Sequence, residues 1–177
     1  MNGYLEIIIG PMYSGKTTSL IRKYEEIIEK QEEAFVINYS DDQRYHNTKL
    51  STHDLKMIDC IQTKCLNDLD CIEEEHILIN ECQFFSDLYE FVENQLSKEK
   101  KIYLYGLDGD FKRKKFGQTL DLIPLCDKVY KLHSLCVYCK NGSKAIFSHK
   151  KDATNQSQIQ IGSDDLYIPL CRFCISI

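Results

Sequence analysis

The first group of residues that could carry out chemistry is a glycine-containing segment near the start of the chain. It reads Gly10-Pro11-Met12-Tyr13-Ser14-Gly15-Lys16-Thr17 and matches the pattern G-x-x-x-x-G-K-[ST]. In this pattern, successive backbone N–H groups surround a phosphate and the lysine brings positive charge to the β- and γ-phosphates. The hydroxyl that follows the lysine is placed to ligate Mg²⁺. The segment therefore predicts a binding site for a nucleotide and its Mg²⁺.

A second polar group stands at the end of the apolar stretch 77–79, where Asn80 is followed by Glu81. A phosphate-binding loop works together with a second strand, whose polar end binds the metal ion and activates the nucleophile. We therefore expect Asn80 and Glu81 to face the loop. The amide oxygen of Asn80 can accept a hydrogen bond from a metal-bound water but brings no charge. Glu81 is thus the acidic candidate at this strand end. The alternative is that Glu81 only faces solvent.

Two pairs of cysteines lie close to the end of the sequence. They are Cys136 and Cys139, and Cys171 and Cys174, with 31 residues between the pairs. Each C-x₂-C turn can bind one side of a Zn²⁺ ion, and two turns complete a closed tetrahedral structural site. A redox-active pair or four buried free thiols are the alternatives. The other cysteines lack metal-ligand spacing and are interpreted as small apolar residues: Cys60, Cys65, Cys71, Cys82 and Cys126.

The elements that must position these residues alternate between strands and helices. Helical spacing of apolar residues predicts one helix from Lys16 up to the charged stretch 31–33, and a second around 88–96 with Asp87 as its N-cap. This alternation favours an α/β fold with a mostly parallel sheet covered on both faces. Beyond about residue 134 the alternation stops, which predicts a P-loop core over 1–134 and a small zinc-binding module over 135–177. Apolar runs predict strands over 5–9, 34–39, 76–80, 101–106 and 128–133.

The composition excludes several classes of protein. With 177 residues, of which 43% are apolar and 28% charged, the chain should fold as a globule with a sizeable core. A formal net charge of −5 argues against nucleic acid as the main partner. No apolar run reaches the ~18 residues of a membrane span, and the first residues do not resemble a signal peptide. We therefore expect a cytoplasmic protein without a membrane partner.

Taken together, these motifs resemble those of the type II thymidine kinases, and the resemblance covers nearly the whole chain. It implies a RecA-like P-loop core with a zinc-bearing lasso module, and transfer of the γ-phosphoryl group of ATP to the 5′-hydroxyl of thymidine. It also implies a homotetramer and feedback inhibition by thymidine triphosphate (dTTP). Further segments that match are 42–45 (DQRY), 52–54 (THD), 81–85 (ECQFF), 107–111 (LDGDF), 122–125 (LIPL) and 167–174.

The resemblance also implies roles for individual residues. Glu81 matches the general base of the family, and Asn80 stands where the family usually has Asp. The segment 10–17 would bind ATP together with Arg44, Asn80 and Gln83. The residues that match the nucleoside pocket are Met12, Leu107, Phe111, Phe116, Ser148 and Tyr167. The lasso residues that would read the base through main-chain hydrogen bonds are Gln158, Ile159, Gln160, Ile161 and Gly162.

Three other functions are compatible with parts of this pattern. A GTPase would need an N-K-x-D motif after the phosphate-binding segment, and the sequence has none. A nucleoside monophosphate kinase must bind an additional phosphate and is expected to use several arginines, whereas the chain has four in all. A zinc module that binds nucleic acid, with the phosphate loop serving only for ATP affinity, conflicts with the acidic charge balance. An ATP-dependent thymidine kinase accounts for the most features.

Overall fold

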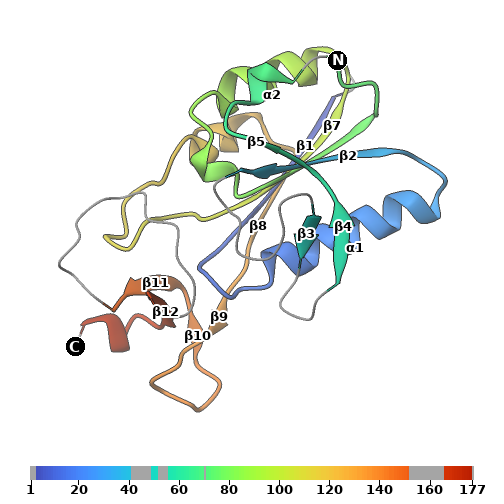
Figure 1. Cartoon of the computed structure of the whole chain (residues 1–177). Helices are drawn as coiled ribbons and strands as arrows, with labels where there is room; N and C mark the ends of the chain where they lie inside the picture. The colour runs from blue at the N-terminus through green and yellow to red at the C-terminus, as the bar shows by residue number, and fades with distance from the viewer. Residues whose placement is uncertain (1–2, 41–48, 52–55, 70, 152–165, 177) are drawn as a thin grey trace.

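A six-stranded parallel sheet with the strand order β5-β2-β6-β7-β1-β8 forms the centre of the molecule (Figure 1). The computed structural model describes residues 3–40, 49–51, 56–69, 71–151 and 166–176. The predicted parallel α/β fold is confirmed, although the last strand ends earlier than expected and β5 was not predicted. The strands are β1 (Tyr4–Ile9), β2 (Ala34–Tyr39), β5 (Ile61–Thr63), β6 (His76–Asn80), β7 (Lys101–Gly106) and β8 (Lys128–Lys131).

Two helices cover opposite faces of this sheet. Successive side chains of a strand point to opposite faces, so each helix packs against a different set of strand residues. Ile8 and Leu78 pack in the same cluster as the buried residues of α1. Ile7, Ile77 and Ile79 pack instead with the buried residues of α2. Both faces are therefore apolar, as a buried parallel sheet requires. The helices are α1 (Lys16–Glu29) and α2 (Leu88–Ser97), drawn below and above the sheet in Figure 1.

Asp87 directly precedes α2, as predicted, but its side chain does not cap the helix. Its Oδ2 accepts hydrogen bonds from the backbone N of Asn67, at 2.9 Å, and from Cys65 Sγ, at 3.0 Å. The carboxylate therefore attaches the segment around residues 65–67 to the start of α2. The prediction of a capping side chain was therefore wrong: Oδ2 binds the segment around residues 65–67, and Oδ1 is buried without a hydrogen-bond partner among the described residues.

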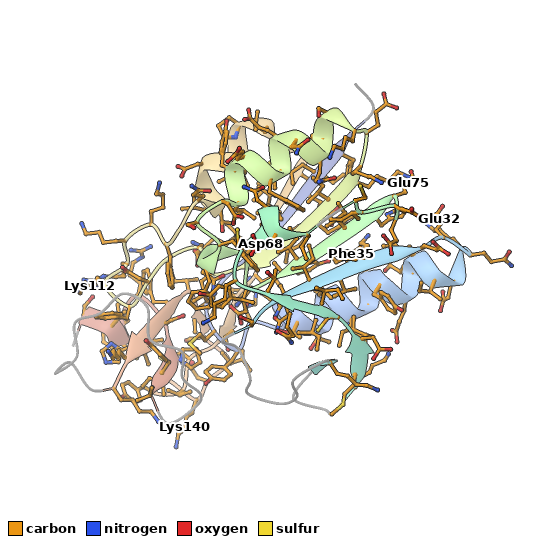
Figure 2. All side chains as sticks on the ribbon, turned by 45° about the horizontal axis from the view of Figure 1, so that its top comes forward. Glu32, Phe35, Asp68, Glu75, Lys112 and Lys140 are labelled. Atoms are coloured by element: carbon orange, nitrogen blue, oxygen red, sulfur yellow. The ribbon has the colours of Figure 1, made fainter. Side chains whose placement is uncertain are left out.

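In the part of the chain that the structure describes, three short two-stranded ribbons lie outside the central sheet. Two of them lie beyond residue 133, where the alternation of strands and helices was expected to stop. Figure 2 shows Lys112 and Lys140 near these C-terminal strands and Glu32 and Glu75 at the opposite end of the sheet. Among the described residues, neither helix has the length and apolar character of a membrane span.

The ribbons pair β3 (Lys49–Ser51) with β4 (Met57–Asp59), β9 (Ser134–Leu135) with β10 (Lys144–Ala145), and β11 (Phe147–Lys150) with β12 (Tyr167–Leu170). The 3₁₀ segments are η1 (Leu66–Asp68), η2 (Cys82–Phe84), η3 (Thr119–Leu125) and η4 (Cys174–Ser176).

The packing predicts that truncating two isoleucines of the same sheet lowers the free energy of unfolding by very different amounts. Ile77 in β6 is fully buried, whereas Ile61 in the edge strand β5 is 46% exposed. We expect Ile77→Ala to lower the free energy of unfolding by about 2–5 kcal/mol, because it removes buried methylenes and leaves a cavity. The matched control Ile61→Ala should cost about 1 kcal/mol or less. Urea denaturation of both variants measures these values, and equal costs would contradict the burial assigned to β6.

Candidate functional site

The segment 10–17 forms the connection between β1 and α1, where the phosphate-binding motif requires it. Lys16 is the first residue of α1 and is buried. Its ammonium nitrogen donates hydrogen bonds to the carbonyl oxygens of Pro11, at 2.7 Å, and Gly10, at 3.1 Å. The loop thus curves around its own lysine. The first turn of α1 offers N–H groups and the positive end of the helix dipole at the same place, which suits a phosphate.

The parallel register brings Glu81 to the same edge of the sheet as this loop. Strand β7 lies between β1 and β6 and pairs with both, so that Asn80, Tyr105 and Ile8 are at one level. The backbone N of Gly10 donates to the carbonyl oxygen of Gly106, at 3.3 Å. Because neighbouring strands are roughly 4.8 Å apart, the ends of β1 and β6 are separated by about 10 Å. The phosphate loop and Glu81 therefore lie on the two sides of the end of β7.

Glu81 follows β6 directly and has a left-handed backbone conformation, with φ of 51°. Its Oε2 accepts a hydrogen bond from Gln83 Nε2, at 2.7 Å. Burial raises the pKa of the adjacent Cys82 thiol to about 12, and the positive charge of Lys16 opposes this rise. The hydrogen bond between this thiol and the Thr119 hydroxyl lowers the pKa more than Lys16 does, and the negative charge of Glu81 raises it. A cation and a carboxylate on two sides of the end of β7 are suited to phosphoryl transfer.

Asn80 is buried at the end of β6 and belongs to a chain of amides that crosses three strands. Its Nδ2 donates to Asn38 Oδ1, at 2.8 Å, and Asn38 Nδ2 donates to Gln62 Oε1, at 3.2 Å. These contacts fix the side chain of Asn80 without adding charge. The sequence analysis did not identify Asn38 and Gln62 as part of the site. They meet Asn80 only through the pairing of β2 with β5 and β6, which no spacing along the sequence reveals. A role of Asn80 in metal binding stays a prediction.

The strand β11 brings one part of the predicted nucleoside pocket to the phosphate loop. The backbone N of Met12 donates to Ser148 Oγ, at 2.9 Å, and Ser148 is buried. Two residues further along β11, the ammonium nitrogen of Lys150 lies 4.9 Å from the centroid of the Phe111 ring. Lys150 also pairs with Tyr167 of β12. Met12, Ser148, Phe111 and Tyr167 are therefore connected through β11, and the contacts of Lys150 could not be anticipated from local spacing.

The other two predicted pocket residues are connected to the strand end that carries Glu81. The backbone N of Leu107 donates to Gln83 Oε1, at 2.9 Å. The ring of Phe116 packs edge to face against Phe84, with a centroid distance of 5.3 Å. Both pocket residues thus contact the segment that follows β6. Arg44 and the lasso residues 158–162, like the matching segments 42–45 and 52–54, lie outside the described residues.

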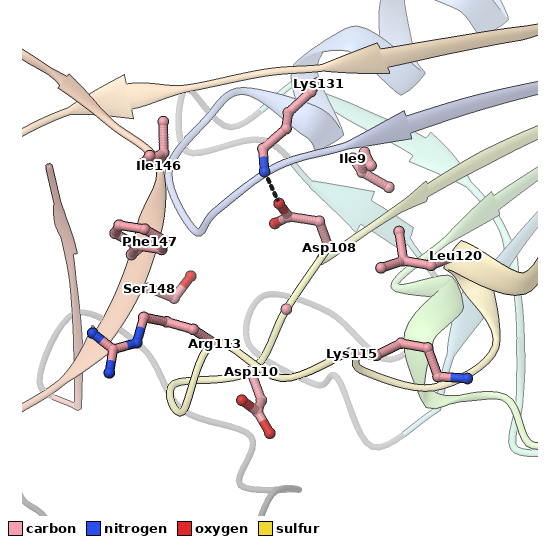
Figure 3. A pocket seen from close by; sticks show the side chains of 11 residues that line it. Ile9, Asp108, Asp110, Arg113, Lys115, Leu120, Lys131, Ile146, Phe147 and Ser148 are labelled. Carbon is pink, nitrogen blue, oxygen red and sulfur yellow. Dashed lines mark ion pairs between the residues drawn. The ribbon is translucent and has the colours of Figure 1, made fainter. Parts of the chain in front are cut away.

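A cavity of about 270 Å³ opens between the chain that follows β7 and strand β11 (Figure 3). Lys131 Nζ lies 2.6 Å from Asp108 Oδ2 on one side of it. Asp110, Arg113 and Ser148 also line this space. Of the six residues that match the nucleoside pocket, Ser148 alone lines this cavity, whose lining also includes the apolar residues Ile9, Leu120, Ile146 and Phe147.

The four cysteines predicted to bind metal are brought together. Their sulfur atoms all lie within 4.8 Å of one another, and Cys139 Sγ is 3.4 Å from Cys174 Sγ and 3.7 Å from Cys171 Sγ. Four sulfurs at ~2.3 Å from a tetrahedral Zn²⁺ would be about 3.8 Å apart, so the spacing fits this ion. Burial acts to raise the pKa of the Cys136 thiol, but backbone N–H groups at residues 138, 139 and 171 donate to the sulfur and lower it to about 6. This favours the thiolate form of Cys136, whereas the hydrogen bond with Cys139 raises the pKa of the Cys174 thiol.

The five remaining cysteines do not share one environment. Cys82 is fully buried, as expected of a small apolar residue. Cys71 is exposed, so this interpretation was wrong for Cys71. Cys60, Cys65 and Cys126 are partly buried.

The sequence is similar to those of known proteins over nearly its whole length. The sequence model of a family described as "Thymidine kinase" matches residues 3–175. The thymidine kinase of Amsacta moorei entomopoxvirus is 38% identical over 178 residues, which cover 96% of either chain. That of Variola virus is 40% identical over 174 residues, with 97% of this chain and 96% of the relative covered. That of Myxoma virus (strain Uriarra) is 38% identical over 175 residues with the same coverage. The chain therefore belongs to the thymidine kinase family.

Proposed function

We propose that the chain transfers the γ-phosphoryl group of ATP to the 5′-hydroxyl of thymidine, producing ADP and thymidine monophosphate. The observation that carries this proposal is the position of the phosphate loop and Glu81 on the two sides of the end of β7. Membership in the thymidine kinase family supports the choice of nucleoside.

In the proposed reaction, Glu81 accepts the proton of the 5′-hydroxyl as the oxygen attacks. A bond forms between O5′ and the γ-phosphorus, and the bond from this phosphorus to the β,γ-bridging oxygen breaks, so that ADP leaves. Lys16 and the N–H groups of the segment 10–17 stabilise the negative charge on the phosphates. Bound Mg²⁺ would supply further positive charge, and Thr17 and Asn80 are the residues proposed to hold the ion. Arg44 would bind the same phosphates.

Thymidine is proposed to bind beside this centre among Met12, Leu107, Phe111, Phe116, Ser148 and Tyr167. The hydrogen bond between Met12 and Ser148 supports a site formed jointly by the phosphate loop and the C-terminal strands. The lasso residues 158–162 would read the base edge with main-chain groups. Fixed amides reject a base with the opposite donor pattern, because buried partners would be left unsatisfied.

The four cysteines are proposed to hold a structural Zn²⁺, since four thiolates leave no open position for chemistry. Residues 135–177 would form the module that contains this ion, and residues 1–134 the P-loop core. A homotetramer, feedback inhibition by dTTP and a cytoplasmic location are proposed from the family resemblance alone.

Removing the proposed base should separate catalysis from nucleotide binding. We expect Glu81→Gln to reduce phosphorylation of thymidine by a factor of about 10²–10⁴, the usual contribution of a general base, with ATP affinity nearly unchanged. Transfer from radiolabelled ATP to thymidine and calorimetric ATP binding measure the two effects. Glu75→Gln, at the opposite end of the sheet, is the control and should keep full activity. Retained turnover in Glu81→Gln would place the base elsewhere.

A carboxylate at position 80 should change the response to magnesium. We expect Asn80→Asp to lower the Mg²⁺ concentration needed for half-maximal rate, because a negative charge attracts a hydrated divalent cation more strongly than an amide does. Asn38→Asp is the matched control, since Asn38 is equally buried but lies one strand further from the phosphate loop. An unchanged Mg²⁺ dependence in Asn80→Asp would remove this residue from the surroundings of the metal.

Breaking the cysteine cluster should release the metal and loosen the C-terminal ribbons. We expect Cys139→Ser to lose bound zinc and to accelerate amide hydrogen exchange in β11 and β12, because β12 is followed directly by Cys171. Elemental analysis and hydrogen exchange measured by mass spectrometry report these effects. Cys71→Ser, at an exposed position outside the cluster, should match the unmodified protein. Full zinc content in Cys139→Ser would rule out a four-cysteine site.

A further inference from the structure

Gln83 is a buried amide whose two ends contact two different parts of the site. Its side chain is 2% exposed. Nε2 donates to Glu81 Oε2, at 2.7 Å, and Oε1 accepts a hydrogen bond from the backbone N of Leu107, at 2.9 Å. The reversed amide would place its oxygen against the carboxylate and its NH₂ group against a backbone N–H. The two partners therefore fix the orientation of the amide.

Two glycines close the space around Gln83. A Cβ atom at Gly106 would lie 2.6 Å from Gln83 Oε1, and a Cβ atom at Gly117 would overlap the carbonyl oxygen of Gln83. Gly117 also has a positive φ of 61°, which side chains rarely adopt. These glycines stand directly before and after the segment 107–116. Both ends of that segment, which carries three of the predicted pocket residues, therefore rest against Gln83.

We propose that Gln83 is a positioning residue that holds the carboxylate of Glu81 in a fixed orientation relative to the segment 107–116, without binding the nucleotide itself. The inference rests on the proposed function, in which Glu81 is the base. It replaces the role in nucleotide binding that the family resemblance implies for Gln83. The juxtaposition of the amide, the carboxylate and the N–H of Leu107 carries the proposal.

The hydrogen bond from Gln83 has two consequences for a base. It fixes the plane of the Glu81 carboxylate, and correct placement of a catalytic group contributes strongly to rate. It also favours the ionised form of the carboxylate, which is the form that a base needs. Because the same amide binds the N–H of Leu107, a shift of this residue when a nucleoside binds would be transmitted to the carboxylate.

The first test is Gln83→Met, which keeps the approximate size of the side chain and removes the donor. We expect kcat to fall about 10- to 100-fold, the effect of losing one hydrogen bond to a charged group. The KM for ATP should stay unchanged, and the acid limb of the pH–rate profile should move to higher pH. Gln95→Met is the matched control, because Gln95 is 5% exposed and lies in α2, away from the site. It should leave both the rate and the pH profile unchanged.

A second variant, Gln83→Glu, keeps the shape and the acceptor for Leu107 but replaces the donor to Glu81 by a second carboxylate. Two carboxylates this close share one proton, so the apparent pKa values of the pair separate and the shape of the pH–rate profile should change, whereas a role of Gln83 confined to Leu107 would leave the profile unchanged. This variant separates the two hydrogen bonds of Gln83. It also keeps the proposal testable if thermal melting shows that Gln83→Met does not fold.

Two results would overturn the positioning role. One is an unchanged kcat and pH profile in both Gln83 variants, and the other is a raised KM for ATP with an unchanged kcat. The variant Glu81→Gln tests the proposed function separately. If Glu81→Gln retained turnover, the proposed function itself would fail, whatever the Gln83 variants show. If Gln83 acts through Glu81, adding Gln83→Met to Glu81→Gln should cause no further loss, whereas an additive loss would contradict the proposal.

Discussion

The parallel register of β6, β7 and β1 is the constraint on which the site depends. It places the turn after β1 and the residue after β6 at one edge of the sheet, with Gly106 of β7 between them. Gly106 has to lack a side chain, because a Cβ atom would lie 2.6 Å from both Cys82 Sγ and Gln83 Oε1. The separation between the phosphate loop and the backbone of Glu81 is thus set by the sheet, whereas the position of the Glu81 carboxylate also depends on its hydrogen bond from Gln83.

Neutral amides surround this edge of the sheet. Asn80, Asn38 and Gln62 satisfy one another across three strands, and Gln83 bridges Glu81 and Leu107. An amide offers both donors and acceptors, so a buried group of amides can be satisfied without the large desolvation cost of buried charges. The negative charge at the end of β6 therefore resides on Glu81, which lies at the edge of this network and not within it.

The sequence predicted those features that a few neighbouring residues are enough to identify. The phosphate loop, the strand that ends in Asn80 and the two cysteine pairs all have such spacing, and the structure places each of them as expected. The contacts of Asp87, Asn38 and Gln83 were not predictable, because each binds a residue brought near by strand pairing or by the packing of a distant segment. The three-residue strand β5 is too short to give a periodic signal.

The hydrogen bond from Met12 to Ser148 joins residues 136 positions apart in the sequence. Met12 belongs to the loop that would bind the nucleotide. Ser148 belongs to β11, and its partner strand β12 is followed by Cys171. A fragment that stopped after β8 would keep every residue of the sheet yet lose the acceptor for this N–H. The boundary expected near residue 134 therefore does not isolate the phosphate loop, because a strand beyond that boundary supplies one of its hydrogen-bond partners.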